Sequence, residues 1–241
     1  MMSHQDEEDE GLLEDGVAPG TTRTTAAKAP GGFNPFGMCA CLSVEYYRPY
    51  FDVNTDDVVK RLKYALMFCG AGSPFLEVVR EKPDAYGPWW IATTLVFLLS
   101  VTSHLTALMH FGRDYEYDFT VVTIAATTVY AYVGVVTLAM WLGLNYWLKT
   151  PMTLLQCGCV VGYSLTVYLP ASVVCVAGPL SWPALLAAWV LSSLFAVKST
   201  FPIVEHLEHQ KLGIVAGAFV VLNGIFMLVV KLEIYRPKKS S

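Results

Sequence analysis

The sequence predicts an all-α integral membrane protein with five transmembrane helices and a long N-terminal cytosolic tail. The first observation behind this prediction is composition: of 241 residues, 54% are hydrophobic and 15% are charged, whereas an average soluble domain has about 25% charged residues. The second is the placement of charge. Residues 1–86 hold 14 acidic and 8 basic residues, whereas residues 87–241 hold 6 and 8. A polar region in front of a long, sparsely charged apolar region is typical of a tailed membrane domain.

Residues 1–41 are expected to form a disordered acidic tail. They contain the acidic run Asp6–Glu10 and almost no bulky apolar side chain before Phe33, so they bury too little apolar area to offset the entropy of ordering. A signal peptide needs a basic region followed by an apolar stretch, and this chain opens on acidic residues instead. We therefore expect the tail to stay in the cytosol.

Residues 42–87 form an aromatic and amphipathic segment. Asn54 or Thr55 can cap a helix whose apolar residues recur at helical spacing as far as Cys69. Its basic residues Lys60, Arg61 and Lys63 are expected to lie mostly off the apolar stripe, so the helix either lies on an anionic leaflet or packs on the membrane bundle. A second short helix, Phe75–Arg80, is expected to lead to the bilayer.

Five segments are apolar and long enough to span a bilayer as helices, which needs about 20 residues each. They lack the alternating pattern of a membrane β-barrel. Pro170 lies inside the third segment and is expected to kink or interrupt it. The segments are Trp89–Phe111, Phe119–Leu148, Met152–Ala177, Trp182–Phe201 and Leu212–Leu232.

Five spans place the two ends of the domain on opposite sides of the membrane. With a cytosolic tail, the C-terminus is luminal. The ending Lys238-Lys239-Ser240-Ser241 has the pattern of a dilysine retrieval signal, which works only in the cytosol. Basic residues flank the spans equally on both sides, so the positive-inside rule does not decide between these readings, and the role of the ending stays open.

No catalytic, cofactor-binding or metal-binding residues are predicted, and the chain is not expected to be an enzyme. Its net charge of −4 argues against nucleic acid as a partner. The segment Glu205–His209 has spacing that suits a metal but lies where a polar loop is expected. Ser164 follows Gly162 as in a rhomboid-like protease, yet a histidine base is in place only at His104 in another helix.

Small residues and intramembrane polar residues suggest two further interpretations. Gly158 and Gly162, like Gly213 and Gly217, are spaced four apart and predict close helix packing, within the bundle or between copies. Polar residues in spans, such as His104 and Gln156, are expensive to bury. They leave a small-solute transporter or channel as the alternative function, which apolar substitutions of His104 and Gln156 would test through loss of activity.

The strongest local pattern is the stretch Pro83–Ile91 at the start of the first span. Asp84 can cap backbone donors, and Gly87-Pro88 can form a turn that fixes how the chain enters the membrane, with Pro88 in the first helical turn. Tyr86 and the tryptophans beside it suit the headgroup level.

This stretch resembles the Asp-Leu-Tyr-Gly-Pro motif of the Ypt/Rab-interacting-protein family, called YIP or YIPF proteins, with Ala85 in place of the leucine. The Gly-Tyr pair of the family is present as Gly162-Tyr163. The resemblance covers residues 45 to about 232 and is closest to the branch of human family members one and two. Further segments that resemble the family are Glu45-Tyr46-Tyr47, Phe51-Asp52-Val53, Ile124-Ala125-Ala126-Thr127 and Tyr130-Ala131-Tyr132.

The resemblance implies a multi-pass Golgi membrane protein, with a cytosolic N-terminus and a luminal C-terminus, that cycles through the endoplasmic reticulum. It implies a non-enzymatic adaptor in vesicle-mediated transport and Golgi organisation that binds prenylated Rab-type GTPases and a YIF-like membrane partner. The motif residues are Asp84, Tyr86, Gly87, Pro88, Gly162 and Tyr163, and partner contacts are expected at Glu45, Tyr46, Tyr47, Phe51 and Asp52. The expected parts are a tail (1–41), the cytosolic segment (42–87), the five-helix domain (88–232) and a C-terminal tail (233–241).

Overall fold

The computed structural model describes residues 51, 53–67, 73–112, 118–150, 152–204 and 209–235. All of them belong to one compact unit, residues 41–241. The predictions for the acidic tail, for residues 45–47 and 52, for residues 205–208 and for the C-terminal ending lie outside the described residues. The part of the chain that is described contains helices and turns and no strand.

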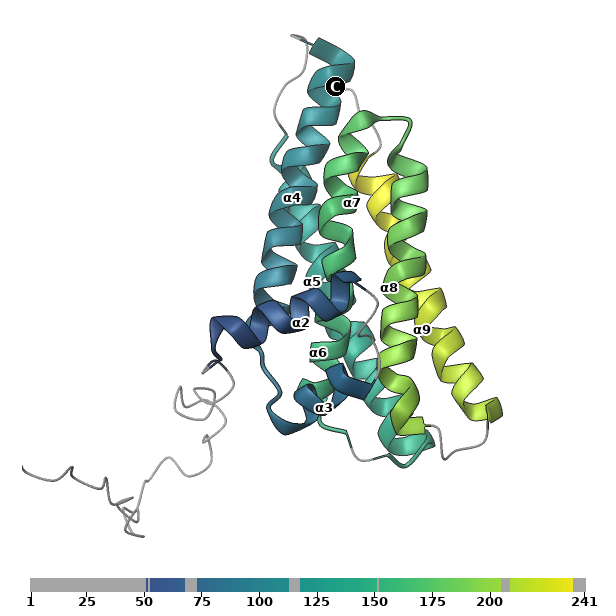
Figure 1. Cartoon of the computed structure of the whole chain (residues 1–241). Coiled ribbons are helices and arrows are strands. Elements are labelled where there is room, and N and C mark those ends of the chain that lie inside the picture. The colour runs from purple at the N-terminus through teal and green to yellow at the C-terminus, as the bar shows by residue number, and fades with distance from the viewer. Residues whose placement is uncertain are drawn as a thin grey trace, which may run out of the picture. The chain divides into compact units, whose positions relative to one another are not determined.

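Five helices are long and apolar enough to cross a membrane, which confirms the predicted fold class (Figure 1). The first and fourth are the single helices α4 and α8. The second and fifth, α5 and α9, end in π-helical turns, η3 and η6. Their bounds are α4 Tyr86–Phe111, α5 Thr120–Leu142, η3 Gly143–Trp147, α8 Ser181–Val204, α9 His209–Val229 and η6 Val230–Ile234.

The third span is interrupted, as Pro170 predicts. It runs as α6 (Leu154–Ser164), a 3₁₀ turn η4 (Leu165–Val167), α7 (Tyr168–Val174) and a final 3₁₀ turn η5 (Cys175–Ala177). Proline has no N–H and its ring collides with the carbonyl four residues earlier, here that of Thr166. The chain tightens into η4 at that carbonyl, and the span then continues to its end.

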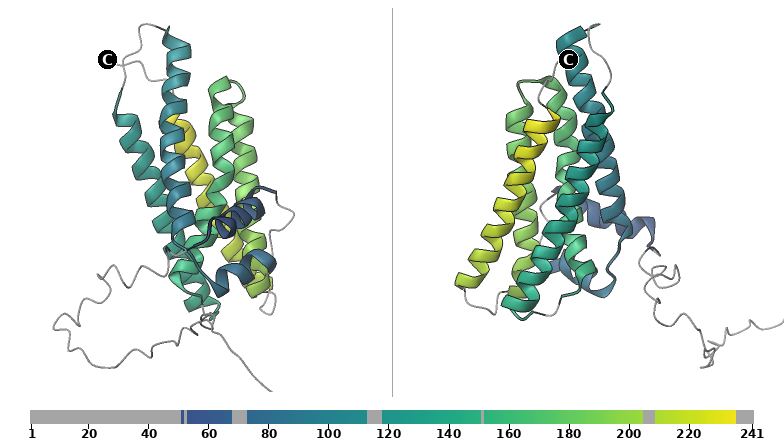
Figure 2. Two further views of the ribbon diagram at one scale, coloured as in Figure 1. Left: turned by 60° about the vertical axis from the view of Figure 1, so that its left-hand side comes forward. Right: turned by 180° about the vertical axis from the view of Figure 1, so that it is seen from behind.

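The third span forms the centre of the bundle. In its most apolar stretch 67% of the residues are buried, against 28% for the spans built on α5 and α9. Seen from behind, α5 and α9 lie in front of the rest of the bundle (Figure 2). The spans built on α5 and α9 are therefore the least buried of the described bundle.

Two short helices, α2 (Thr55–Met67) and α3 (Ser73–Glu81), precede the first span and dock on α6, η4 and α8. Ala65 on α2 and Phe75 and Val79 on α3 are fully buried. The ring of Phe75 meets those of Phe195 and Tyr163 edge to face, with centroids 4.9 and 5.7 Å apart. Of the two arrangements open at the sequence level, α2 thus packs on the bundle.

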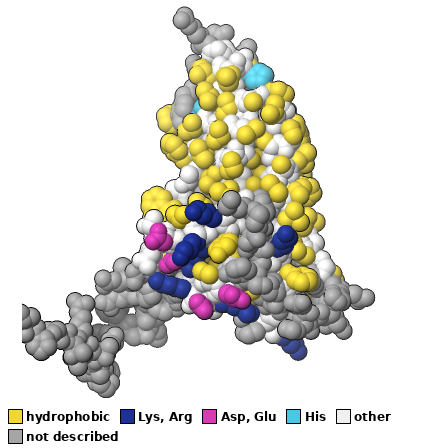
Figure 3. Space-filling view, in the orientation of Figure 1, with side chains coloured by type: hydrophobic (Ala, Val, Ile, Leu, Met, Phe, Trp, Pro, Cys, Tyr) yellow, Lys and Arg dark blue, Asp and Glu magenta, His cyan; other side chains and the backbone are white. Residues whose placement is uncertain are grey.

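Charged side chains gather over α2 and α3, whereas the far part of the same face shows hydrophobic and uncharged side chains and no Lys, Arg, Asp or Glu among the described residues (Figure 3). The end of the bundle at which α2 and α3 dock is called the α2 end below. Among the described residues, its exposed charges include Asp56, Lys60, Lys63, Glu77, Arg80, Glu81 and Lys82.

Candidate functional site

An ion pair is buried where the chain enters the first span. The Arg61 guanidinium on α2 contacts the Asp84 carboxylate in the loop before α4, and each side chain is only 1% exposed. Nη2 of Arg61 also donates to the backbone oxygen of Lys82, at 2.7 Å. Since charges this deeply buried are stable only when paired, the pair ties α2 to the loop that starts the first span.

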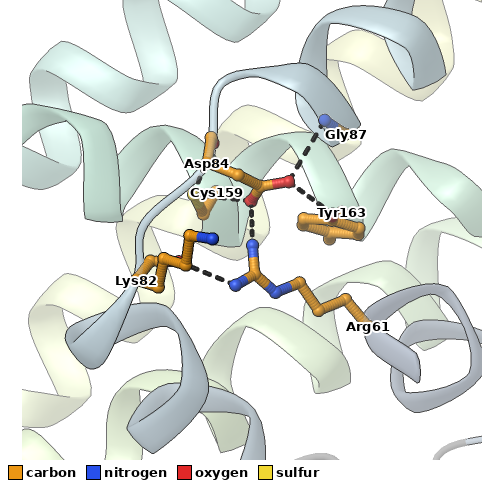
Figure 4. A network of polar contacts seen from close by, with 6 residues as sticks. All are labelled: Arg61, Lys82, Asp84, Gly87, Cys159 and Tyr163. Atoms are coloured by element: carbon orange, nitrogen blue, oxygen red, sulfur yellow. Dashed lines mark hydrogen bonds and ion pairs between the residues drawn. The ribbon is translucent and has the colours of Figure 1, made fainter. Parts of the chain in front are cut away.

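The Asp84 carboxylate also joins this loop to α6 (Figure 4). The hydroxyl of Tyr163 donates to Oδ2 at 2.9 Å, and the backbone N–H of Gly87 donates to the same oxygen at 3.2 Å. The thiol of Cys159 donates to the backbone oxygen of Asp84 at 2.9 Å. We call Arg61, Asp84, Gly87, Cys159 and Tyr163 the entrance junction.

Two glycines allow α4 to approach α6 this closely. A Cβ added at Gly162 would lie 2.4 Å from Cβ and 2.8 Å from Cα of Pro88, and one added at Gly87 would lie 2.0 Å from the Tyr163 oxygen. Atoms do not approach to such distances, so both positions require glycine. The structure thus brings together five of the predicted motif residues: Asp84, Gly87, Pro88, Gly162 and Tyr163. Asp84 and Tyr163, which are hydrogen-bonded to each other, are 79 residues apart in the chain.

Tyr86 and the tryptophans after it face outward from the junction. Tyr86, Trp89 and Trp90 are 40%, 57% and 52% exposed. The ring of Tyr86 contacts that of Trp90, with centroids 6.0 Å apart. Amphipathic rings exposed at the start of a span suit the membrane–water interface, so these residues border the junction and take no part in its hydrogen bonds.

Arg61 lies on the buried side of α2, although the sequence pattern predicted that it and the neighbouring lysines lie mostly off the apolar stripe. Arg61 follows Val58 by three residues and precedes Ala65 by four, which is the spacing of one helical face. The spacing was therefore a usable signal, but the charge of arginine made a solvent-facing position the natural expectation. The Cys159 thiol bond was also missed, because nothing in the sequence links it to Asp84.

Other residues singled out in the sequence lie outside the entrance junction. No atom lies within 4 Å of a Cβ added at Gly213 or Gly217, so this pair makes no close contact within the described bundle. Gln156 does not lie in mid-span, since it forms a capping box with Thr153 at the start of α6. Ser164 donates to the backbone oxygen of Val161 in its own helix, at 2.7 Å. Phe51 is 49% exposed.

The buried amide of Asn223 holds the fifth span to the core. It accepts from the Tyr168 hydroxyl at 3.0 Å and donates to the hydroxyls of Ser192 and Ser193 at 3.1 and 3.0 Å. These contacts link α7, α8 and α9. The polar atoms of Asn223 therefore have protein partners, and this residue has a packing role.

An apolar groove opens between α5, α8 and α9, with a volume of about 150 Å³. The hydrogen bond from Gln156 to the Arg80 carbonyl, 3.5 Å long, places the start of α6 next to α3, and η3 ends only a few residues before α6 begins. The groove residues Gly143 and Trp147 in η3 therefore lie toward the α2 end. A second hollow of about 380 Å³ between α5 and α9 shares Val136 and Leu222 with it. Other lining residues of the first groove are Ala139, Met140, Ala196, Val197, Thr200, Ile214, Val215, Ala216, Ala218 and Phe219.

The described residues offer no metal centre, because no three His, Cys, Asp or Glu side chains among them gather closely enough to hold an ion. The entrance junction is buried, and its carboxylate, phenol and thiol are hydrogen-bonded within the protein. The junction therefore has a structural role, since it connects α2, the first span and the third span.

Comparison with known proteins places this architecture in a family. The family model described as "Yip1 domain" matches residues 72–230. A Dictyostelium discoideum protein named YIPF1 homolog is 35% identical over 199 residues, which are 80% of this chain and 56% of that protein. The protein YIP5 of Schizosaccharomyces pombe is 33% identical over 125 residues, 51% of this chain and 49% of its own length. The chain thus spans about half the length of these curated relatives.

No solved structure matches the chain. The family match nevertheless covers every residue of the entrance junction except Arg61. It also covers Pro88, Gly162 and most of the five spans. The chain belongs to the Yip1 domain family of multi-pass membrane proteins.

Proposed function

We propose that the protein is a non-enzymatic Golgi membrane adaptor in vesicle-mediated transport that binds prenylated Rab-type GTPases and a YIF-like membrane partner. Membership of the Yip1 domain family supports a role in membrane traffic. The GTPase, the partner, the Golgi location and the orientation with a cytosolic α2 end belong to the proposal.

The observation that carries the proposal is the apolar groove toward the α2 end. A prenylated GTPase needs a polar surface for the protein and an apolar one for the lipid. The α2 end offers both, since exposed charges of α2 and α3 lie at the same end as the groove. The groove is lined almost entirely by apolar side chains of α5, α8 and α9, so an isoprenoid chain can enter it without burying an unpaired polar group.

Lipid dependence of binding tests the proposal. Purified full-length protein in nanodiscs is mixed with one GTPase in prenylated and unprenylated form, and retention is measured. Ala139→Phe, at an exposed position of α5 in the groove, is expected to lower retention of the prenylated form about tenfold by filling the groove. Ala187→Phe, at an exposed position of α8 outside the groove, is the matched control and is expected to bind normally.

Equal binding of the unprenylated GTPase, or equal loss in both variants, would remove the groove from the proposal. Capture of the tagged protein from mild detergent supplies the second arm. Recovery of a YIF-like five-span protein without GTPases would leave a trafficking complex without lipid reception.

A further inference from the structure

A second polar site lies at the end of the bundle remote from α2. A cavity of about 130 Å³ is lined there by the last turns of α4, by η5, by the start of α8 and by η6. His110 follows Tyr86 by 24 residues of one helix, which is roughly 36 Å along its axis. The cavity is therefore nearly a full bilayer thickness from the entrance junction. Its polar lining residues are Thr106, His110, Cys175, Ser181, Lys231 and Tyr235.

Lys231 supplies the positive charge of this cavity. Its ammonium donates to Oγ of Ser181 and lies 5.4 Å from the centroid of the Trp182 ring. An ammonium has three N–H donors, so the bond to Ser181 leaves capacity for a ligand. A lysine within a span is costly unless an anion or the interface accommodates it, and the exposed Trp182 beside it is a residue of the interface.

The charge of the lining favours an anion. None of the described residues that line the cavity is acidic, and Glu233, the acid nearest to Lys231 in sequence, is not part of the lining. Ser181 is the first residue of the 24-residue helix α8, whose positive end adds to the field of Lys231. The Ser181 hydroxyl, which accepts from Lys231, keeps its own proton to donate. Ammonium, imidazole and hydroxyl groups together suit an oxyanion.

We propose that the Lys231 cavity binds a phosphate group at the membrane surface remote from α2. The phosphate is that of an anionic phospholipid headgroup or of a soluble phosphate compound, which share this chemistry. The position of Lys231 and Trp182 at the end of their spans places the cavity at headgroup level. The site is independent of the proposed GTPase binding, which concerns the opposite end of the bundle.

The test titrates the purified full-length protein in neutral detergent with three probes at constant ionic strength. The probes are dioleoyl phosphatidic acid, dioleoylglycerol, which has the same chains without phosphate, and inorganic phosphate. The midpoint of thermal unfolding reports binding. Phosphatidic acid, and not dioleoylglycerol, is expected to raise the midpoint of the wild type, and Lys231→Met is expected to weaken its apparent affinity roughly tenfold.

Lys198→Met is the matched control, because Lys198 is exposed on α8 away from the cavity, and it is expected to respond like the wild type. His110→Gln changes an exposed lining residue without burying a new group, so it tests the site even if Lys231→Met does not fold. An equal effect of inorganic phosphate would assign the site to a soluble phosphate. A response of Lys231→Met and His110→Gln identical to the wild type would overturn the proposal.

Discussion

At the scale of single residues, the entrance junction depends on the buried carboxylate of Asp84, whose charge is neutralised by Arg61. Asp84 is held by an ion pair, a phenol and a backbone N–H. The Nε of Arg61 has no hydrogen-bond partner in the described structure, so the protein contacts of this arginine do not fully offset the cost of removing its guanidinium from water. Such a pair contributes little net stability compared with apolar residues of the same shape, but loss of one member leaves the other as an isolated buried charge.

Arg61→Met is therefore expected to lower the free energy of unfolding by about 3–5 kcal/mol. Adding Asp84→Asn should recover part of the loss, because the amide removes the isolated charge and keeps an oxygen for Tyr163. Lys60→Met, on the exposed side of the same helix, should change stability by less than about 0.5 kcal/mol. Unfolding by denaturant in mixed micelles measures all three. A double variant no more stable than Arg61→Met would contradict this account.

At the scale of elements, hydropathy predicted all five spans because twenty apolar residues in lipid have few alternatives to a helix. Pro170 marked the break in the third span for an equally local reason. The entrance junction was only partly predictable. The Gly-Pro and Gly-Tyr motifs were visible as separate patterns, but a pairing such as Asp84 with Tyr163 depends on which spans become neighbours. Likewise, the spacing of Gly158, Gly162, Gly213 and Gly217 did not reveal that Gly162 alone is crowded to below 3 Å.

The crossing of α4 over α6 gives a paired prediction. Gly162→Ala should lower stability by about 1–3 kcal/mol, because its methyl group must displace the backbone of Pro88. Gly158→Ala, one turn earlier on α6, meets its nearest atom, of Thr137, at 3.7 Å. That change should be neutral or stabilising by up to about 1 kcal/mol, since alanine favours a helix. Melting temperatures in detergent compare the two, and equal destabilisation would contradict the special role given to the contact between Gly162 and Pro88.

At the scale of the whole described bundle, two polar ends enclose an apolar middle. The α2 end carries the charges of α2 and α3 and the groove, and the other end carries the Lys231 cavity. Five spans require that the residues just before α4 and just after η6 lie on opposite sides of a membrane. The connections between spans alternate between the two sides accordingly.

This alternation predicts which positions a membrane-impermeant maleimide reaches in sealed vesicles. In a chain with Cys39, Cys41 and Cys69 replaced by Ser, the remaining Cys157, Cys159 and Cys175 are buried. In the proposed orientation, with a cytosolic α2 end, Lys149→Cys, between η3 and α6, should be labelled in vesicles whose outer face is cytosolic. Leu180→Cys, which is exposed just before α8, should be labelled only after detergent is added. Labelling of both in intact vesicles would contradict a five-span arrangement.

The long separation between the halves of the entrance junction also fixes an order of events during synthesis. Asp84 precedes Tyr163 by 79 residues, which a ribosome adds in roughly 4–16 s at about 5–20 residues per second. During that interval Arg61 and Asp84 have left the ribosome, but the third span that buries them has not. The junction closes only when α6 is inserted, so a nascent chain stalled after its second span displays an open carboxylate and an undocked α2 to the cell's quality-control machinery.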